Sequence, residues 1–376
     1  MTEMETPTPP DRILFLIDHF KDPHAGTEAQ LHRLVTELVN RGTQCHLSVL
    51  KSSQYLERGN FPCPWSALGH TSLGAPATWR AMRKLGRQKA AEGFQLAHTF
   101  FNDASVIAPP MLALSSIRTL ISRRDMGFWY NRRNLTLLRL TNRWVSACVA
   151  NSHSVAEVTA RQERIPKDKL HVIYNGLPDT APSDFPVPEL AALRERGRIL
   201  AGLVANIRPI KRMHDLIDAL GHLQADAPAL DVVIIGSGDA NALRKRAADL
   251  GVAERVHFLG QRSDVAACLR YFDMGVLCSE SEGFSNALIE YMRAGLPSVC
   301  TETGGNPEAV QDQLTGLLYP VGDVRMLAAR LLELVNQPVM GKAMGEAAQQ
   351  VAKERFSVRA MANAHCRVYQ QVLSAP

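Results

Sequence analysis

The sequence predicts an α/β protein made of two doubly wound, Rossmann-like domains that face a cleft. Short apolar runs alternate with longer amphipathic stretches along most of the chain, which is typical of parallel β-α-β units covered on both faces. The 376 residues are enough for two domains of ordinary size. A segment with four prolines at 178–188 interrupts the alternation, and we expect one domain on each side of it.

We expect a similar series of strands in each domain. In the first domain they are 13–17, 46–50, 95–100, 118–121, 147–150 and 171–174. In the second they are 199–205, 231–235, 256–259, 275–278, 297–300 and 316–319. The segment from 324 to about 373 has no strand-like run, so it is predicted to be helical. We expect a helix at its end to pack back across the cleft onto the first domain.

These elements set the expected boundaries. Residues 1–11 are polar and rich in proline, so we expect a disordered tail rather than a signal peptide. An N-terminal domain is expected over 12–178, followed by a linker over 179–197. A C-terminal domain is expected over 198–345 and a C-terminal helix over 346–376.

The composition excludes several classes of protein. Hydrophobic residues make up 46% of the chain and charged residues 21%, which is typical of an ordered globular protein. No apolar run approaches the roughly 18 residues of a membrane span, so we expect a cytoplasmic protein. The seven cysteines include no CxxC pair, which favours reduced thiols over disulfides or a zinc site.

The net charge of +5 is concentrated in the first half of the chain. Residues 1–180 carry 22 Lys and Arg against 15 Asp and Glu. Such an excess would attract an anionic partner, such as a phosphorylated ligand or lipid headgroups at the inner face of a membrane. An ordinary solvated surface with an arginine excess explains it equally well.

The most informative stretch is SESEGFSNALIEYMRAGLP, at 279–297. It follows the predicted strand 275–278, and Ser285 is the predicted N-cap of a helix over 286–294 that ends before Gly295. The site is therefore a strand-loop-helix corner at the carboxyl edge of the sheet. Its amides and the helix dipole favour an anion such as a diphosphate. The amides expected to point to this corner belong to Gly283, Phe284, Ser285 and Asn286.

Two carboxylates flank this anion site. Glu282 stands in the loop before the helix, and Glu290 sits about one turn inside it. A carboxylate accepts two hydrogen bonds well, which suits the vicinal hydroxyls of a ribose or a hexose. Glutamates at this spacing also occur by chance on solvated helices, so the spacing alone does not decide between a site and a surface.

The segment EGFSNALIE, together with AGLP, GGNPE at 304–308, TGLLYPVGD at 315–323 and VIYNG at 172–176, resembles glycosyltransferase family 4. The match runs from about Ile13 to Asp323. The resemblance implies the GT-B fold, a nucleotide-diphosphate-sugar donor on the C-terminal domain, an acceptor on the N-terminal domain, and transfer with retention at the anomeric carbon. In that family the first Glu of a Glu-x7-Glu motif lies near the donor sugar and the second binds the ribose. These roles correspond to Glu282 and Glu290.

The loop VANIRPIKR, at 204–212, supplies cations that could neutralise the leaving diphosphate. Lys211 aligns with a lysine of the family. Asn206 stands where family members commonly have an arginine, and the nearest arginine is Arg208.

Two segments of the N-terminal domain also resemble the family. The loop DHFKDPHAGTEAQ, at 18–30, is similar to a Gly-Gly-Thr-Glu loop with Ala25 in place of the first glycine. Gly26 and Thr27 would let the backbone approach the phosphate or sugar of the donor. His98, near the end of the predicted strand 95–100, matches the first of two histidines often seen there in the family, and Phe100 replaces the second. A buried structural role for His98 is the alternative.

Residues 123–144 combine Phe128, Trp129 and Tyr130 with six arginines. The combination suits an acceptor groove or contact with a membrane surface, and no RNA-binding signature accompanies it, so we expect no nucleic acid. We expect 135–144 to be an ordinary helix whose Leu and Trp side chains face the core. The better site candidates are Arg123, Arg124 and Asp125 at the strand end.

We therefore expect a retaining hexosyltransferase of polysaccharide or cell-envelope biosynthesis, with a UDP-sugar preferred over a GDP-sugar and a glycan or lipid-linked acceptor. No Asp-x-Asp occurs, so neither a metal nor any other cofactor is expected. A non-catalytic sugar-nucleotide binding protein and a GT-B-like sugar-nucleotide epimerase are the alternatives. The expected catalytic residues are Glu282, Lys211, Arg208 and His98. The expected donor-binding residues are Gly26, Thr27, Gly260, Gly283, Phe284, Ser285, Asn286 and Glu290.

Overall fold

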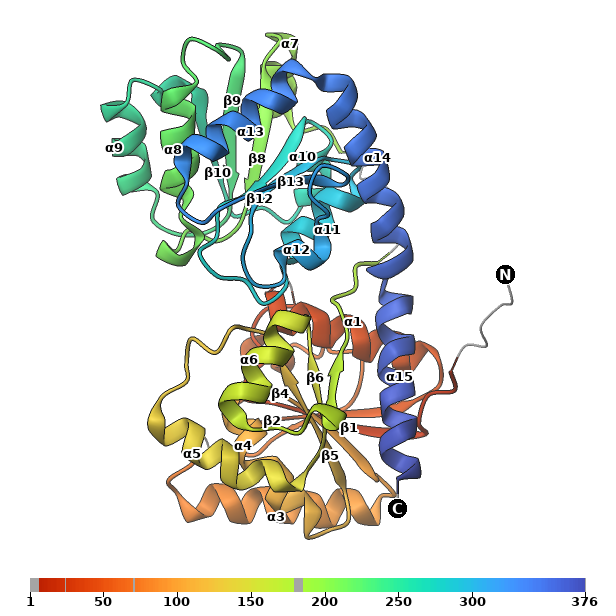
Figure 1. The fold of residues 1–376 in the computed structure, drawn as a ribbon. Coiled ribbons are helices and arrows are strands. Elements are labelled where there is room, and N and C mark those ends of the chain that lie inside the picture. Colours follow the sequence, from red (N-terminus) through yellow and green to blue (C-terminus); the bar gives the residue numbers. More distant parts are fainter. Residues whose placement is uncertain (1–6, 24, 70–71, 179–184, 376) are drawn as a thin grey trace. The chain divides into compact units, whose positions relative to one another are not determined.

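The computed structural model describes residues 7–23, 25–69, 72–178 and 185–375. Most of the predicted tail and residues 179–184 of the predicted linker lie outside the described residues. The chain divides into an N-terminal unit, Met1–Pro178 with Ser357–Pro376, and a C-terminal unit, Asp179–Phe356. Each unit is built on one parallel sheet covered by helices (Figure 1).

The N-terminal unit contains a seven-stranded sheet in the order β3-β2-β1-β4-β5-β6-β7, and every pair of neighbouring strands is parallel. Its strands are β1 Arg12–Ile17, β2 Gln44–Val49, β3 Trp65–Ala67, β4 Leu96–Phe100, β5 Arg118–Arg123, β6 Val145–Ala150 and β7 Leu170–Val172. Its helices are α1 Gly26–Asn40, α2 Gln54–Glu57, α3 Pro76–Ala91, α4 Asn102–Ala113, α5 Arg132–Thr141, α6 His153–Glu163 and α15 Val358–Ser374, with the 3-10 turns η1 Asn142–Trp144 and η2 Lys167–Lys169.

Alternate side chains of β1 face two different helical layers. Ile13, Phe15 and Ile17 pack with α1 and α15, whereas Leu14 and Leu16 pack with α3 and α4. Helix α15 lies beside α1 on one face of the sheet (Figure 1). The last helix of the chain therefore completes the core of the N-terminal unit.

Backbone contacts fix the start of α15. The amide of Val358 donates to the carbonyl of Leu177 at 3.0 Å, and Ser357 caps the helix by accepting from Ala360 at 3.1 Å. A Cβ on Gly176 would lie 2.8 Å from the carbonyl oxygen of Ser357, so the glycine of VIYNG permits this close approach. Where the sequence predicts one helix over 346–376, the structure has the end of α14, an extended residue at Ser357, and α15.

The C-terminal unit contains a six-stranded parallel sheet in the order β10-β9-β8-β11-β12-β13. Its strands are β8 Ile199–Val204, β9 Leu230–Ile235, β10 Val256–Gly260, β11 Met274–Leu277, β12 Ser298–Thr301 and β13 Gly316–Tyr319. Its helices are α7 Pro188–Glu195, α8 Met213–His222, α9 Asn241–Asp249, α10 Val265–Leu269, α11 Asn286–Arg293, α12 Asn306–Ala309, α13 Val324–Asn336 and α14 Pro338–Arg355, with the 3-10 turns η3 Pro209–Lys211 and η4 Ala253–Arg255. Part of the predicted linker is thus the ordered helix α7.

Each sheet has one switch point, where the strand order reverses. It lies between β1 and β4 in the N-terminal unit and between β8 and β11 in the C-terminal unit. The loops after two such strands diverge to opposite faces, and open α/β sheets bind ligands beyond the strand ends at this place. Lys211 follows β8 and Glu282 follows β11, so both predicted residues lie at the switch point of the C-terminal sheet.

Candidate active site

Lys211 and Glu282 form an ion pair at this switch point. Nζ of Lys211 lies 2.5 Å from Oε1 of Glu282, and Oγ of Ser279 donates to the same oxygen at 2.6 Å. No described residue donates to the second carboxylate oxygen, Oε2. The side chains of Lys211 and Glu282 are 23% and 12% exposed, so a ligand can reach both charges. Sequence reasoning missed Ser279, which only the folded loop turns toward Glu282.

The loop that carries Glu282 is held by the segment after β12. Oγ1 of Thr301 donates to the carbonyl of Ser279 at 2.7 Å, and the amide of Gly305 donates to the carbonyl of Glu282 at 3.2 Å. Gly304 has a φ of +52°, and a Cβ there would lie 1.8 Å from the same carbonyl oxygen. The two glycines of GGNPE therefore let this segment support the glutamate from behind.

The three cations after β8 differ in their partners. Arg212 holds the buried Asp215 with two hydrogen bonds, at 2.8 and 3.0 Å, and these bonds raise the pKa of Arg212. Lys211 is paired with Glu282. Arg208 is exposed and forms no ion pair with a described residue. Arg208 and Lys211 are thus the cations of this loop that a bound anion could engage.

Asn206 and Gly260 support this loop through their neighbours. Oδ1 of Asn206 accepts hydrogen bonds from the amide and hydroxyl of Ser237 at 3.2 and 2.9 Å. The carbonyl of Gly260 accepts from the amide of Gly236 at 2.8 Å, and a Cβ on Gly236 would lie 1.9 Å from the carbonyl oxygen of Ala205. The residue that replaces the arginine common in the family therefore has a structural role here.

Helix α11 begins where the sequence predicts. Ser285 has an extended backbone at the N-cap position, and its side chain makes no capping hydrogen bond. Phe284 is buried against Phe356, with ring centroids 5.3 Å apart, so the chain enters the helix at a fixed angle. Asn286 and Glu290 are half-buried on the helix surface. The N-terminal end of a helix attracts negative charge, which suits a bound anion.

In the N-terminal unit, the loop before α1 accommodates Ala25 without strain. Ala25 is the N-cap of α1, with φ −71° and ψ 140°, a conformation open to any residue. Oε1 of the buried Glu28 accepts from the amide of Lys21 at 2.5 Å, which folds the loop over the helix. Gly26 is exposed and Thr27 is half-buried at the start of the helix.

Asp18 shapes the switch point of the N-terminal sheet. Its two carboxylate oxygens accept from the amides of Ala104 at 2.7 Å and Asp103 at 3.2 Å, at the start of α4. Burial raises the pKa of Asp18 to about 6. No local sequence pattern indicates this role, because the helix that Asp18 caps begins more than 80 residues later.

His98 lies in the core of the N-terminal unit. It has no exposed surface, and its ring nitrogens lie 2.8 Å from Oη of Tyr369 and 2.8 Å from Oγ of Ser122. Burial holds the pKa of His98 well below its ordinary value. This geometry favours the structural alternative, in which His98 links β5 to α15, over a catalytic role.

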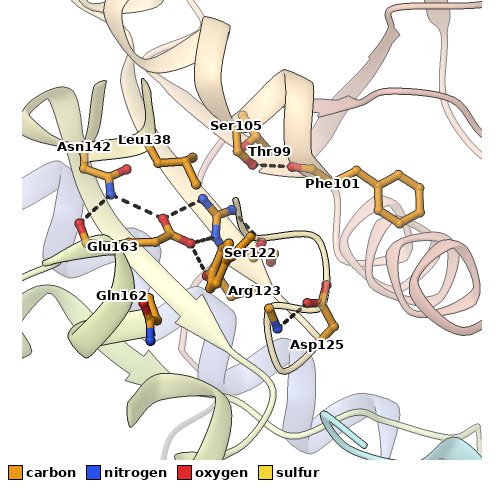
Figure 2. A network of polar contacts seen from close by, with 12 residues as sticks. Thr99, Phe101, Ser105, Ser122, Arg123, Asp125, Leu138, Asn142, Gln162 and Glu163 are labelled. Atoms are coloured by element: carbon orange, nitrogen blue, oxygen red, sulfur yellow. Dashed lines mark hydrogen bonds and ion pairs between the residues drawn. The ribbon is translucent and has the colours of Figure 1, made fainter. Parts of the chain in front are cut away.

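Arg123 belongs to a buried polar network (Figure 2). Its guanidinium makes two hydrogen bonds to Glu163, at 2.5 and 2.9 Å, and Tyr130 donates to the same carboxylate at 2.5 Å. Nδ2 of Asn142 also donates to it at 3.3 Å. Although burial opposes the charges, the pair raises the pKa of Arg123 and lowers that of Glu163. This buried ion pair joins β5 to the end of α6, so the geometry favours a structural role for Arg123.

Asp125 and Arg124 differ from Arg123. Oδ1 of Asp125 accepts from the amide of Gly127 at 2.7 Å and shapes the following loop. Arg124 is half-buried, and its Nη2 donates to Oδ1 of Asn175. Of the two arginines at this strand end, Arg123 is paired with Glu163, whereas Arg124 has no acidic partner among the described residues.

Helix α5 is less buried than predicted. Leu138 faces the core, but Leu140 is 53% and Trp144 39% exposed, because Trp144 lies in the turn η1 with Arg143 stacked on its ring. The expectation that the Trp of 135–144 faces the core is therefore wrong.

Within the described part of the chain, no helix has the length and apolar character needed to span a bilayer.

Comparisons with known proteins agree with this architecture. The family model described as Glycosyltransferase Family 4 matches residues 24–180, and the one described as Glycosyl transferases group 1 matches residues 191–351. The crystal structure of Anabaena Alr3699/HepE in complex with UDP has a TM-score of 0.82 and 24% sequence identity, and the match covers 96% of this chain and 100% of that chain. This similarity shows the fold, and the chain has the two-domain GT-B fold.

Two relatives define the family relationship. The chain is 28% identical to the N-acetyl-alpha-D-glucosaminyl L-malate synthase of Bacillus anthracis over 60% of this chain and 59% of that protein. The chain thus spans less than two thirds of that relative. It is 30% identical to the phosphatidyl-myo-inositol mannosyltransferase of Mycolicibacterium smegmatis over 97% of this chain and 95% of that protein. Because that second match extends over nearly the whole of both proteins, the chain belongs to glycosyltransferase family 4.

Proposed function

We propose that this protein is a retaining glycosyltransferase that moves a sugar from a nucleotide-diphosphate-sugar to a glycan or lipid-linked acceptor, as in polysaccharide or cell-envelope biosynthesis. The observation that carries the proposal is the partly buried Lys211–Glu282 pair at the switch point of the C-terminal sheet. It stands just before the first turn of α11, whose amides favour an anion. A cation, a carboxylate and a helix N-terminus together suit a diphosphate joined to a sugar.

In the proposed reaction, the bond between the anomeric carbon and the diphosphate oxygen breaks, and its electron pair stays on the diphosphate. Lys211, with the amides of α11 and the exposed Arg208, neutralises the negative charge that grows there. The open oxygen of Glu282 accepts hydrogen bonds from the sugar and stabilises its developing positive charge. The acceptor oxygen forms the new bond on the same face, and its proton passes to the released nucleoside diphosphate. Glu290 holds the ribose.

UDP is the proposed nucleotide of the donor. The Anabaena protein with the same fold was solved in complex with UDP, which supports the choice of uridine as the nucleoside of the donor. No metal is proposed to assist, because the chain has no Asp-x-Asp to hold one on the diphosphate. EDTA should therefore leave the rate nearly unchanged. Loss of activity that Mn²⁺ restores would contradict this part of the proposal.

The proposed acceptor surface is the basic face of the N-terminal unit. Two shallow grooves, of about 480 and 450 Å³, meet at Trp79 and Gly74 between α3, α5 and the end of α4. The side chains that line them combine apolar groups with arginine, which suits a lipid-linked or phosphorylated acceptor. The arginines in the two linings are Arg80, Arg83, Arg132 and Arg133.

The test is release of nucleoside diphosphate from a panel of UDP- and GDP-sugars, without acceptor. Slow hydrolysis of one donor, abolished in Lys211→Ala, is expected because water can replace the acceptor hydroxyl. Binding without release would instead favour a non-catalytic sugar-nucleotide binding protein. Conversion of the donor to an epimer, detected by NMR of the sugar nucleotide, would favour an epimerase.

A further inference from the structure

Arg123 and Arg124 stand side by side in the sequence but have different surroundings. The guanidinium of Arg123 is buried against Glu163. Arg124 is half-buried and makes one side-chain hydrogen bond, to Oδ1 of Asn175. Within the described ranges, no carboxylate lies within ion-pair distance of Arg124.

The environment of Arg124 makes an unpaired cation unfavourable. Burial lowers the pKa of Arg124 to about 10, and the ring of Phe100, whose centroid lies 6.0 Å from Cζ, is a weak partner for the charge. The nearby rings of His98 and His365 cannot balance this charge, because a histidine is either neutral or cationic. Burial lowers the pKa of both histidines, and the charge of Arg124 is a smaller cause. A guanidinium still charged near neutral pH is stabilised by an oxyanion that it can bind with two parallel N–H groups.

Arg124 also lies where ligands bind to open sheets. It directly follows β5, Phe100 ends β4 and Asn175 lies shortly after β7, so the three residues share the carboxyl edge of the N-terminal sheet. The Arg123–Glu163 pair anchors the strand end from which Arg124 projects. The position of the cation is therefore fixed by the fold rather than left to a mobile side chain.

We propose that Arg124 binds a phosphoryl group of the acceptor. The inference rests on the proposed function, which gives the N-terminal unit to the acceptor and the donor's diphosphate to Lys211, Arg208 and α11. A second anion site in the other unit is more than the donor alone requires. It therefore selects, among glycan and lipid-linked acceptors, those that carry a phosphate.

The experiment measures binding of inorganic phosphate to the full chain by calorimetry, at constant ionic strength and with UDP at saturation. The wild-type protein should bind phosphate beside UDP. Arg124→Gln should bind phosphate at least about tenfold more weakly than the wild type. The affinity of Arg124→Lys should lie between these two, because lysine keeps the charge but cannot donate two parallel hydrogen bonds from a planar group. Arg161→Gln, which removes an exposed arginine of the same unit, should bind phosphate as the wild type does.

Folding is checked by the apparent Tm, which should not fall in Arg124→Gln because no ion pair is broken. Unchanged phosphate binding in that variant overturns the proposal. Weaker UDP binding in it also overturns the proposal, because Arg124 would then serve the donor. If UDP does not bind even to the wild type, the proposed function fails instead, and the comparison of phosphate binding without UDP still decides the role of Arg124.

Discussion

Lys211 and Glu282 neutralise each other when no ligand is bound, and each is also placed to meet a different part of one donor. A diphosphate near Nζ of Lys211 would compete with Oε1 of Glu282, while Oε2 stays open to the sugar. The pair is only partly buried, so it contributes little to stability, about 0–1 kcal/mol, and can be broken without unfolding the protein.

Lys211→Ala should therefore reduce kcat/KM about 100-fold or more and leave the Tm almost unchanged. The loss follows from removal of a cation that acts on the leaving group in the transition state. Steady-state release of UDP measures it, with Lys245→Ala as the control because Lys245 is an exposed lysine of the same unit. Near-wild-type turnover in Lys211→Ala would show that the lysine does not act on the diphosphate.

Glu282 and Glu290 should respond differently to the same substitution. Glu290→Gln should mainly raise the KM for the donor, because a ribose contact is equal before and during the reaction. Glu282→Gln should mainly lower kcat, because the charge of Glu282 faces developing positive charge. UDP affinity, measured separately, should fall only in Glu290→Gln. If both variants change KM alone, Glu282 is a binding residue and not a catalytic one.

Residues in local motifs could be placed from the sequence, and residues defined by distant partners could not. Lys211 and Glu282 each follow a predicted strand, so their meeting at one sheet edge was foreseeable. Arg123 looked like a site residue because its partner, Glu163, lies 40 residues further along the chain. The partner of His98, Tyr369, is 271 residues away. Burial against such partners is decided by tertiary packing.

At the scale of elements, the Arg123–Glu163 pair holds β5 and the following loop to α6. Arg123→Gln should destabilise the N-terminal unit by about 3–5 kcal/mol, because Glu163 then stays buried without its cation. All four tryptophans belong to this unit, so their fluorescence during urea unfolding reports on it selectively. Arg123→Met combined with Glu163→Gln should cost less than Arg123→Gln alone. An equal or larger loss in the double variant would mean that packing, not the unpaired charge, sets the cost.

Helix α15 makes the N-terminal unit sensitive to acid. His365 on this helix is buried, and burial lowers its pKa to about 4, below the ordinary 6.5. Between pH 6.5 and 4, His365 binds a proton in the unfolded chain but not in the folded chain. The contribution of neutral His365 to the free energy of unfolding is therefore complete above pH 6.5 and is lost as the pH falls toward 4. From His365 alone, the loss at pH 4.5 is about 2–3 kcal/mol.

The prediction is checked by urea unfolding at pH 7.5 and 4.5, followed by tryptophan fluorescence. His365→Gln should lose less stability than the wild type between these two pH values. His222→Gln, at an exposed histidine of the C-terminal unit, should match the wild type. The same loss in His365→Gln as in the wild type would assign the acid sensitivity to other groups.

The strands were the most predictable elements. Each expected strand is present with its ends shifted by no more than two residues, because five or six apolar residues between helices form a strong local pattern. The sequence missed β3, Trp65–Ala67, which has three residues at the edge of the sheet and follows a proline. It also missed the break between α14 and α15, where Ser357 caps the second helix, because the apolar spacing of a helix continues across Phe356 and Ser357.

At the scale of the whole chain, the charge is divided unequally between the units. Helix α3 presents the exposed cations Arg80, Arg83, Lys84 and Arg87. If this face meets a membrane, the protein should co-sediment with anionic vesicles at low salt and dissociate as salt rises, because exposed charges are screened within about 10 Å at 0.1 M. Failure to bind such vesicles at low salt would make the charge excess an ordinary solvated surface.

The control separates this face from net charge. Replacement of Arg80, Arg83 and Arg87 by Gln should weaken vesicle binding strongly. Replacement of the exposed Lys245, Lys342 and Lys353 of the C-terminal unit by Gln removes the same charge and should have a much smaller effect. Equal losses in the two variants would show that the total charge alone drives binding.

The contribution of α15 to the first core bears on synthesis at the ribosome. Ile13, Phe15 and Ile17 are made before the C-terminal unit, but the side chains that cover them from Met361 onward are made after it. At about 5–20 residues per second, the chain between Pro178 and Ser357 takes on the order of 10–40 seconds to translate. During that interval an apolar strip of the nascent N-terminal unit stays uncovered and open to chaperones. A premature stop just before Ser357 would therefore leave the C-terminal unit complete and damage the unit that was translated first.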